Sequence, residues 1–251
     1  MLPADSASRA ASTPEASGDW SSGTFGKKSM TTLPLIFNHG HLFVELDGHL
    51  WLFDTGAPTS FGVADRLLMG NQHFNLTSSY FGLTASTLSQ YVGVECSGLL
   101  GADVLGRFDH ILDTKGGRLA VSAAELSHDG QRVHLEEFMD IPIVTASVGG
   151  SDYRMFFDTG AQISYFQEDS LADFHTAGSV TDFYPGVGQF QTDTHEVPIS
   201  LGDISFLLRC GCLPGLLGAT LMMADTQGII GNQVLIDRVV GFFPRRGILC
   251  L

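Results

Sequence analysis

Positive charge is scarce in this chain of 251 residues, which has 13 lysines and arginines against 27 aspartates and glutamates and a formal net charge of −14. A surface of this sign repels phosphate backbones and anionic lipid headgroups, so we expect neither nucleic acid nor a membrane among its partners. No apolar run approaches the roughly 18 residues that a transmembrane helix needs. The first residues lack a basic segment followed by an apolar one, the pattern of a secretory signal peptide, and this favours a cytoplasmic location.

Cysteine is also rare, with only four in the chain. They are too few and too unevenly spaced to frame a small disulfide-rich secreted protein. Cys210 and Cys212 are not followed by histidines at the spacing of zinc ligands, so we expect no metal there. The remaining alternatives are buried thiols, or one bridge from this pair to Cys250.

Glycine and phenylalanine are abundant, at 30 and 18 residues, whereas tryptophan occurs twice. Apolar residues make up 44% of the chain and charged residues 16%, which is enough to build a core and too little charge for a disordered chain. The length allows one large domain or two small ones. We therefore expect an all-β protein with few short helices.

The chain repeats one pattern twice. In the first copy an extended segment and a hairpin, residues 33–53, run into Asp-Thr-Gly-Ala at 54–57. In the second copy residues 141–157 run into the same four residues at 158–161. Each copy also has an apolar segment between two glycines further along, GLLG at 98–101 and GIIG at 228–231.

The repeat sets the expected boundaries, with a short helix in each copy, over residues 63–70 and 167–178. The intervening polar segment is interpreted as a linker. The predicted parts are a flexible leader or pro-segment (1–30), an N-terminal lobe (31–122), a linker (123–139) and a C-terminal lobe (140–251).

A pair of aspartates in two such loops has a specific chemical use. Two carboxylates that lie together cannot both ionise cheaply, so the pair retains one proton. The ionised member can then take a proton from water, while the protonated member donates a hydrogen bond to a carbonyl oxygen. The candidates for this pair are Asp54 and Asp158.

The other residues of the two loops fit a supporting role. Gly56 and Gly160 allow a turn too tight for a side chain, which brings the main chain close to the carboxylate. Thr55 and Thr159 carry hydroxyls that can bond between the two copies and hold the loops rigidly.

These motifs resemble those of the aspartic peptidases of the pepsin and retropepsin superfamily. FDTGA at 53–57 and at 157–161, together with the two Gly-x-x-Gly segments, carries the resemblance, which covers about residues 33 to 251. It implies a two-lobed acid protease barrel fold, pepsin-like or retropepsin-like, with an internal pseudo-twofold. It also implies that Asp54 and Asp158 are the catalytic aspartates, that an activated water cleaves a peptide or protein substrate, and that no cofactor or metal takes part.

Two departures from the pepsins modify this expectation. Ala57 and Ala161 stand where pepsins carry a hydroxyl residue, and losing a donor to the carboxylate should raise the pKa of the pair. We therefore predict an activity optimum in mildly acidic solution. The first lobe is too short to supply the hairpin that covers the substrate, so we assign this cover to residues 186–206 of the second lobe, with Tyr184 or Phe190 near its tip.

Other polar residues receive structural interpretations. Ser60 and Ser164 each follow an aspartate by six residues, and a hydroxyl that stabilises the loop is preferred to a nucleophile because no histidine adjoins either one in sequence. His39, His41 and His49 are interpreted as surface or internally bonded histidines because no cluster of metal ligands accompanies them.

The predicted function is therefore an aspartic endopeptidase in one polypeptide, acting as a monomer. One alternative is a peptide-binding or scaffold protein that keeps the fold without cleaving. Another is a dimer in which lobes of two chains pair.

Overall fold

The computed structural model describes residues 30–167, 171–215 and 218–251, most of which form β-strands. The all-β class is confirmed. The leader predicted over 1–30 lies, except for Met30, outside the described residues. Within the described ranges, no helix is long and apolar enough to span a bilayer.

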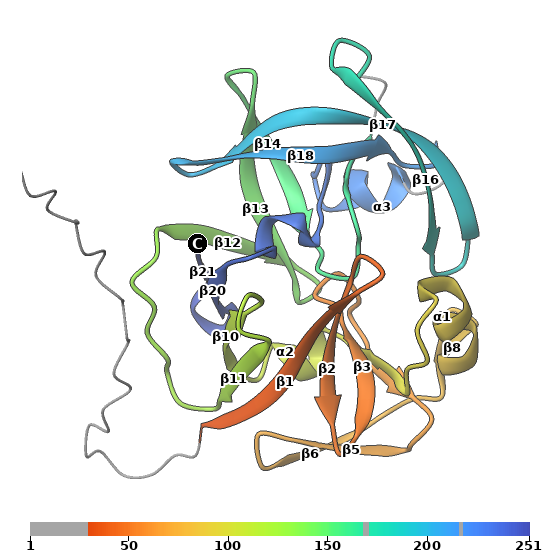
Figure 1. The fold of residues 1–251 in the computed structure, drawn as a ribbon, viewed down its shortest axis with the longest axis vertical. Coiled ribbons are helices and arrows are strands. Elements are labelled where there is room, and N and C mark those ends of the chain that lie inside the picture. Colours follow the sequence, from red (N-terminus) through yellow and green to blue (C-terminus); the bar gives the residue numbers. More distant parts are fainter. Residues whose placement is uncertain (1–29, 168–170, 216–217) are drawn as a thin grey trace, which may run out of the picture.

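The N-terminal half comprises residues 31–122 and forms the lower part of the molecule in Figure 1. Its elements, in order, are β1 (Thr31–Asn38), β2 (His41–Leu46), β3 (His49–Phe53), β4 (Phe61–Gly62), β5 (Arg66–Met69), β6 (Gln72–Asn75), β7 (Ser79–Tyr80), β8 (Leu83–Thr84), α1 (Ala85–Val92), β9 (Gly98–Leu100), α2 (Ala102–Leu105), β10 (Asp109–Asp113) and β11 (Arg118–Ser122).

The C-terminal half, from residue 132 onward, forms most of the upper part, and its last strands lie beside β10 (Figure 1). Its elements are β12 (Arg132–Phe138), β13 (Ile141–Val148), β14 (Ser151–Phe157), β15 (Ser164–Phe166), β16 (His175–Tyr184), β17 (Gly188–Leu201), β18 (Ile204–Cys212), α3 (Gly218–Met223), β19 (Gly228–Ile230), the 3-10 turn η2 (Asn232–Leu235), β20 (Val239–Phe243), the 3-10 turn η3 (Pro244–Arg246) and β21 (Ile248–Cys250).

The sequence repeat corresponds to a repeat of strand pairing. In the N-terminal half, β1, β2 and β3 form an antiparallel meander, β3 runs parallel to β9, and β4 pairs antiparallel with β9. In the C-terminal half, β12, β13 and β14 form the same meander, β14 runs parallel to β19, and β15 pairs antiparallel with β19. The last residues of β3 and β14 face equivalent partners, Phe53 opposite Leu100 and Phe157 opposite Ile230.

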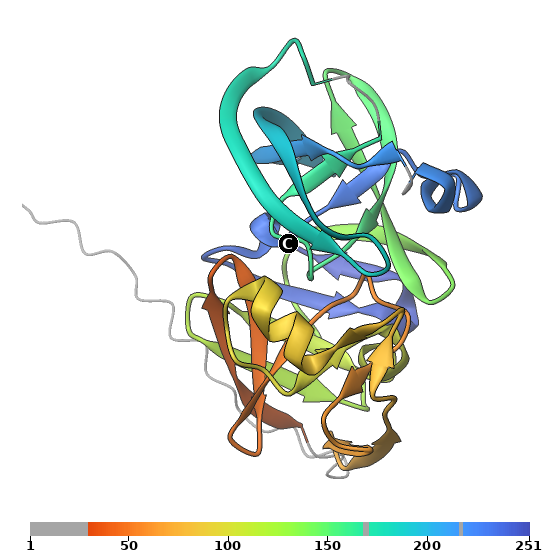
Figure 2. The ribbon, with the colours of Figure 1, turned by 90° about the vertical axis from the view of Figure 1, so that its right-hand side faces the viewer.

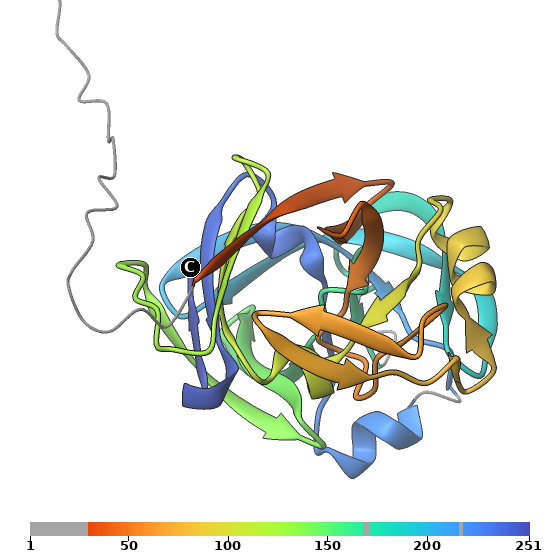
Figure 3. The same ribbon diagram turned by 90° about the horizontal axis from the view of Figure 1, so that it is seen from below.

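One antiparallel sheet joins the two halves. Its strands follow the order β1, β11, β10, β20, β21 and β12, so strands of the N-terminal half occupy one side and strands of the C-terminal half the other. The junction is the pairing of β10 with β20, from His110 opposite Phe242 to Asp113 opposite Val239. Figure 3 shows these strands along one flank of the molecule. The halves are therefore bound by main-chain hydrogen bonds as well as by side chains.

The hydrophobic core also crosses the junction. One cluster contains fully buried side chains of both halves, among them Phe53 and Phe108 on one side and Phe157 on the other. Burying an apolar side chain of this size stabilises the fold by roughly 1.5–3 kcal/mol. Asp109 adds a polar connection, because this fully buried carboxylate of β10 pairs with Arg245, at 2.7 Å, and with Arg246 of η3.

One predicted local structure is wrong, and another segment contains a strand that the sequence analysis does not predict. Residues 66–69 form strand β5 rather than a helix, because Leu67 and Met69 point into the core while Leu68 lies exposed, which is the alternation of a strand. The linker predicted over 123–139 contains β12, whose Val133 and Leu135 are buried in alternation with polar residues. The second predicted helix, over 167–178, is in part outside the described residues, and its described end enters β16.

Among the described residues, the cysteines follow the first of the two alternatives, buried thiols without a bridge. Cys96, Cys210 and Cys250 are buried thiols, and no bridge joins Cys210 or Cys212 to Cys250. Burial raises the pKa of the Cys210 thiol above its usual range and so suppresses its reactivity.

Candidate active site

The two Asp-Thr-Gly loops begin where β3 and β14 end. The backbone N–H of Asp54 donates to the carbonyl of Leu100 at 3.0 Å, and the N–H of Asp158 donates to the carbonyl of Ile230 at 2.9 Å. Each aspartate is therefore held at the end of its strand by the parallel strand that contains the Gly-x-x-Gly motif. This motif supports the loop directly.

The serines that follow the loops have the structural role that we predicted. The hydroxyl oxygen of Ser60 accepts a hydrogen bond from the N–H of Gly101 at 2.8 Å, and that of Ser164 accepts one from Gly231 at 3.1 Å. Both serines are buried. They tie each Asp-Thr-Gly loop to the last glycine of its own Gly-x-x-Gly segment.

The threonines bond between the two halves, as expected from the sequence. The Thr55 hydroxyl donates to the carbonyl of Phe157 at 2.6 Å and accepts from the N–H of Thr159 at 3.0 Å. In the reciprocal pair, the Thr159 hydroxyl donates to Phe53 at 2.7 Å and accepts from the N–H of Thr55 at 3.0 Å. Both threonines are buried, so this exchange fixes the two loops against each other.

The two glycines make room for the opposite aspartate. A Cβ added to Gly56 would lie 2.2 Å from Cγ of Asp158, and one added to Gly160 would lie 2.5 Å from Cγ of Asp54. The two carboxyl groups therefore lie close together, and each affects the pKa of the other. The sequence prediction that Asp54 and Asp158 meet is therefore matched by the geometry.

Burial and mutual repulsion decide the protonation of this pair. Burial raises the pKa of Asp54 well above its usual range, and the neighbouring charge of Asp158 raises it further. Burial likewise raises the pKa of Asp158. Backbone N–H groups of Gly56 and Ala57, each 2.9 Å from Asp54 Oδ1, oppose this effect but do not outweigh it. Both shifts favour a pair that keeps one proton to a higher pH than an isolated carboxyl group would.

A further set of polar contacts links the halves beside the pair, and the sequence did not reveal it. His41 of β2 is buried, its Nδ1–H donates to the carbonyl of Gly160 at 3.2 Å, and its Nε2 accepts from the amide of Gln162 at 3.0 Å. The amide nitrogen of Asn232 donates to the carbonyl of Gly40 at 2.9 Å. Burial lowers the pKa of His41 to about 4, so the imidazole is neutral in this network.

The histidines therefore separate into two environments. His41 is internally bonded, whereas His39, in the turn before β2, and His49, the first residue of β3, lie exposed. Across residues 30–167, 171–215 and 218–251, no three His, Cys, Asp or Glu side chains are grouped as metal ligands would be.

The carboxyl pair forms part of the floor of a cleft of about 500 Å³. The remaining walls are largely apolar and aromatic, and both halves contribute to them. The residues that line it include Tyr80, Phe81, Met139, Tyr165, Asp182, Phe183, Tyr184, Phe190, Leu213 and Ile229. Phe81 and Met139 are 74% and 67% exposed at the rim, which leaves apolar surface open to a ligand.

A long hairpin of the C-terminal half covers the cleft. Strands β16 and β17 pair from His175 opposite Glu196 to Tyr184 opposite Gly188, and their turn, residues 185–187, lines the cleft. Figure 2 shows this hairpin bending from the C-terminal half toward the N-terminal half. Tyr184 and Phe190, the two residues predicted near the tip, lie on either side of its turn and line the cleft. The range predicted for the cover, 186–206, begins too late in the chain, because the covering hairpin already begins at His175. It also extends too far, because residues 202–203 form the next turn, between β17 and β18.

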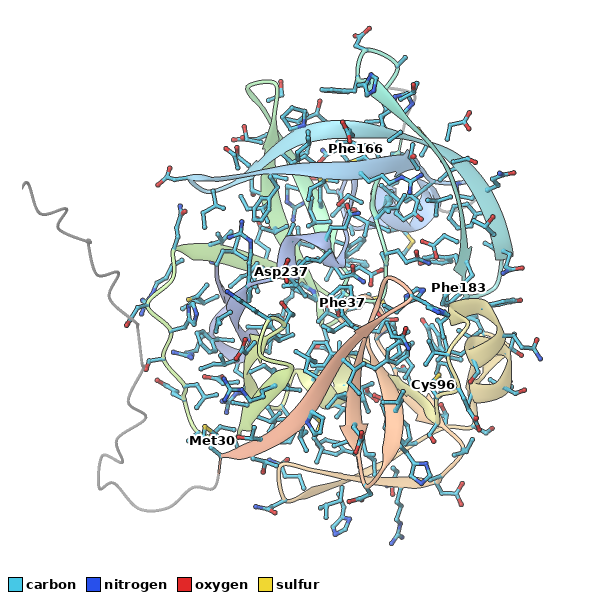
Figure 4. All side chains as sticks on the ribbon, viewed as in Figure 1. Met30, Phe37, Cys96, Phe166, Phe183 and Asp237 are labelled. Atoms are coloured by element: carbon cyan, nitrogen blue, oxygen red, sulfur yellow. The ribbon has the colours of Figure 1, made fainter. Side chains whose placement is uncertain are left out.

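The cover contacts the N-terminal half through aromatic side chains. The ring of Phe183 lies 5.2 Å from that of Tyr91 and 6.2 Å from the imidazole of His41, centroid to centroid. Figure 4 shows Phe183 at the lower end of the hairpin, beside α1. The Thr84 hydroxyl caps the first turn of helix α1 and so stabilises its beginning. The helix ends at Gly93, which has a φ of 67°.

The chain was compared with known proteins. No protein-family model matches it, and no curated protein matches it.

Proposed function

We propose that this protein is an aspartic endopeptidase that hydrolyses peptide bonds with Asp54 and Asp158. The observation that carries the proposal is the interlocking of the two loops, in which each glycine makes room for the carboxyl group of the opposite loop. Two partly buried aspartates whose loops interlock at the floor of a cleft are suited to share one proton.

The reaction follows from that shared proton. The ionised carboxylate takes a proton from a water molecule as the water oxygen attacks the carbonyl carbon of the substrate. The protonated partner donates a hydrogen bond to the carbonyl oxygen, which becomes negatively charged as the tetrahedral species forms. Return of a proton to the leaving nitrogen breaks the C–N bond and restores the pair. No covalent link between protein and substrate is formed.

The substrate is an extended peptide with apolar side chains. The cleft offers aromatic walls in both halves and exposed apolar rims at Phe81 and Met139. The cover hairpin offers main-chain groups near its tip, and an extended peptide can pair with such groups as an added strand. Apolar pockets on alternate sides would then receive successive side chains.

With this function we propose the two-lobed fold of the pepsin-like or retropepsin-like proteases. We also propose that the protein acts as a monomer. One chain supplies both aspartate loops, and the sheet formed by β10 and β20 joins them. A second copy is not required for the pair to form. Light scattering at low protein concentration tests this point: a monomer supports it, whereas a dimer whose activity falls on dilution supports pairing between chains.

The decisive experiment measures cleavage of a diverse peptide library by the purified protein from pH 3 to pH 7. We expect cleavage that is abolished in both Asp54→Asn and Asp158→Asn, because asparagine keeps the shape of the side chain but cannot take up the proton. The matched control is Asp203→Asn at the exposed turn between β17 and β18.

Three results contradict the proposal. Cleavage that persists in either asparagine variant requires another mechanism. Binding of peptides without cleavage at any pH favours the non-cleaving alternative. Loss of activity in Asp203→Asn would show that the effect is not specific to the pair. Thermal unfolding of each variant verifies that it is folded.

A further inference from the structure

A third carboxyl group lies in the cleft beside the proposed catalytic pair. Asp182 belongs to β16 of the cover hairpin, and only 6% of it is exposed. Its carboxylate accepts a hydrogen bond from the hydroxyl of Tyr165 on β15 and another, at 2.8 Å, from the backbone N–H of Phe183. Asp182 and Tyr165 both line the cleft, and the proposed hydrolysis uses neither of them.

The charge of Asp182 has no counterion in the cleft. Among the described residues that line it there is no lysine, arginine or histidine. The groups that face Asp182 are the phenol of Tyr165 and the carboxyl of Asp158, and neither can be positively charged. Arg209 reaches the same hairpin, but its guanidinium bonds to main-chain carbonyls at the outer end of β16. Burial raises the pKa of Asp182 to about 6.

A buried carboxylate without a cation destabilises the protein that contains it. A ligand with a cationic group compensates the buried charge of Asp182. This part of the cleft therefore favours a cationic ligand over a neutral one. The Asp182 carboxylate already accepts two bonds, but each of its oxygens keeps a further acceptor site.

The walls around Asp182 suit the rest of a basic side chain. The ring of Phe190 packs against that of Tyr165, with centroids 6.0 Å apart, and Leu213 and Ile229 line the same part of the cleft. Lysine and arginine bury an apolar stem and keep a cationic head beside a polar partner. The net charge of −14 also attracts basic peptides.

We propose that Asp182 is a specificity determinant of the cleft and that it binds the lysine or arginine side chain of a peptide substrate. Tyr165 is a positioning residue that holds the carboxylate toward the cleft. This inference rests on the proposed function, because it assigns a subsite of the same cleft.

The test uses pairs of peptides that differ only in lysine or norleucine, placed in turn at each position around the cleaved bond. We expect one position at which the wild-type protein prefers lysine, and a preference that grows from pH 5 to pH 7 as Asp182 ionises. In Asp182→Asn the ratio of kcat/KM for lysine to that for norleucine should fall by about tenfold or more, because a hydrogen bond to a charged group is lost.

Two further variants separate specificity from general damage. In Tyr165→Phe the midpoint of the pH-dependent preference should move upward, because the phenol no longer stabilises the ionised carboxylate. Asp193→Asn makes the same change at an exposed position of β17 and should keep the wild-type ratio. An equal preference for lysine and norleucine at every position in the wild type overturns the inference, as does a ratio that Asp182→Asn leaves unchanged.

A binding measurement keeps the inference distinct from the proposed function. The same peptides are titrated into Asp158→Asn and into the double variant Asp158→Asn/Asp182→Asn by calorimetry. Tighter binding of the lysine peptides that disappears in the double variant supports the subsite, even if the wild type cleaves nothing. Absence of cleavage by the wild type would refute the peptidase alone.

Discussion

Each residue of the two Asp-Thr-Gly loops has a partner in the opposite half. The threonine hydroxyls exchange hydrogen bonds across the junction, and the glycines leave space for the opposite carboxyl groups. A substitution in one loop therefore disturbs the aspartate of the other. This reciprocity explains why the two copies of the motif match residue for residue.

The glycine requirement is testable with Gly56→Ala. The new methyl group would overlap Asp158, since Cβ would lie 2.2 Å from its Cγ, so the carboxyl pair must separate. We expect loss of peptide cleavage and a lower free energy of unfolding in urea. The control is Gly215→Ala, where a Cβ meets nothing within 4 Å and the stability should stay within about 0.5 kcal/mol of the wild type. Full activity of Gly56→Ala would contradict the observed packing of the loops.

The threonine exchange is testable with Thr55→Val, which keeps the shape of the side chain and removes the hydroxyl. The carbonyl of Phe157 and the N–H of Thr159 then lose their partners in a buried position. We expect the free energy of unfolding to fall by about 2–4 kcal/mol, measured by chemical denaturation. Thr55→Ser should restore most of it, and Thr145→Val, at an exposed position of β13, should have little effect. Equal stability of the valine and serine variants would disprove the role of the hydroxyl.

At the scale of the element, the cover hairpin is the part that differs most between the halves. Strands β16 and β17 have no counterpart of similar length in the N-terminal half, where β7 and β8 form a short hairpin that lines the same cleft. The hairpin is joined to the N-terminal half by the contacts of Phe183 with Tyr91 and His41. Its position over the cleft therefore depends on an aromatic contact that the N-terminal half provides.

We expect Tyr91→Ala to loosen this cover. Removing the ring takes away the surface on which Phe183 packs, so the backbone N–H groups near the hairpin tip should exchange with solvent severalfold faster. The KM for a peptide should rise more than kcat changes. Hydrogen exchange measured by mass spectrometry tests the faster exchange at the hairpin tip. Tyr91→Phe keeps the ring and should behave like the wild type, and unchanged exchange in Tyr91→Ala would show that the contact does not hold the hairpin.

The sequence predicted the site better than it predicted the elements around it. The two loops and their supporting Gly-x-x-Gly segments are short, local and repeated, so residue identity and spacing suffice to find them. The sequence predicts a helix over 63–70, where residues 66–69 form strand β5, because so short a segment does not separate the two periods. Asp182 was missed because an aspartate in a polar strand gives no local sign of its burial, which the packing of β15 against the hairpin determines.

At the scale of the whole molecule, buried ionisable groups couple stability to pH in opposite directions. Burial lowers the pKa of His110 from 6.5 to about 4 and raises that of Asp182 to about 6. At a pH between the folded and unfolded pKa of His110, the unfolded chain binds more protons at this histidine than the folded protein does. At a pH between the two pKa values of Asp182, the unfolded chain binds fewer protons at this aspartate. Acidification from pH 6.5 to pH 4 therefore removes stability through His110 and adds it through Asp182.

We therefore expect His110→Gln to flatten the fall in stability between pH 6.5 and pH 4. His110 lies fully buried among aromatic rings and donates to the carbonyl of Leu105 at 2.8 Å, a bond that glutamine can retain. The difference between variant and wild type should change by a few kcal/mol across this range, measured by urea unfolding at each pH. His49→Gln at an exposed position is the control. Parallel curves for His110→Gln and the wild type would refute the assignment.

The unequal contributions of the two halves to the cover give the cleft a direction. The floor, with its paired loops, looks nearly the same after half a turn, so by itself it would admit a peptide backbone in either orientation. The roof comes mainly from the C-terminal half, and among the described residues that line the cleft Asp182 has no acidic counterpart in the N-terminal half outside the pair. A peptide and its sequence-reversed version would thus meet different surroundings, and the N-to-C polarity of whatever is bound is chosen by the roof.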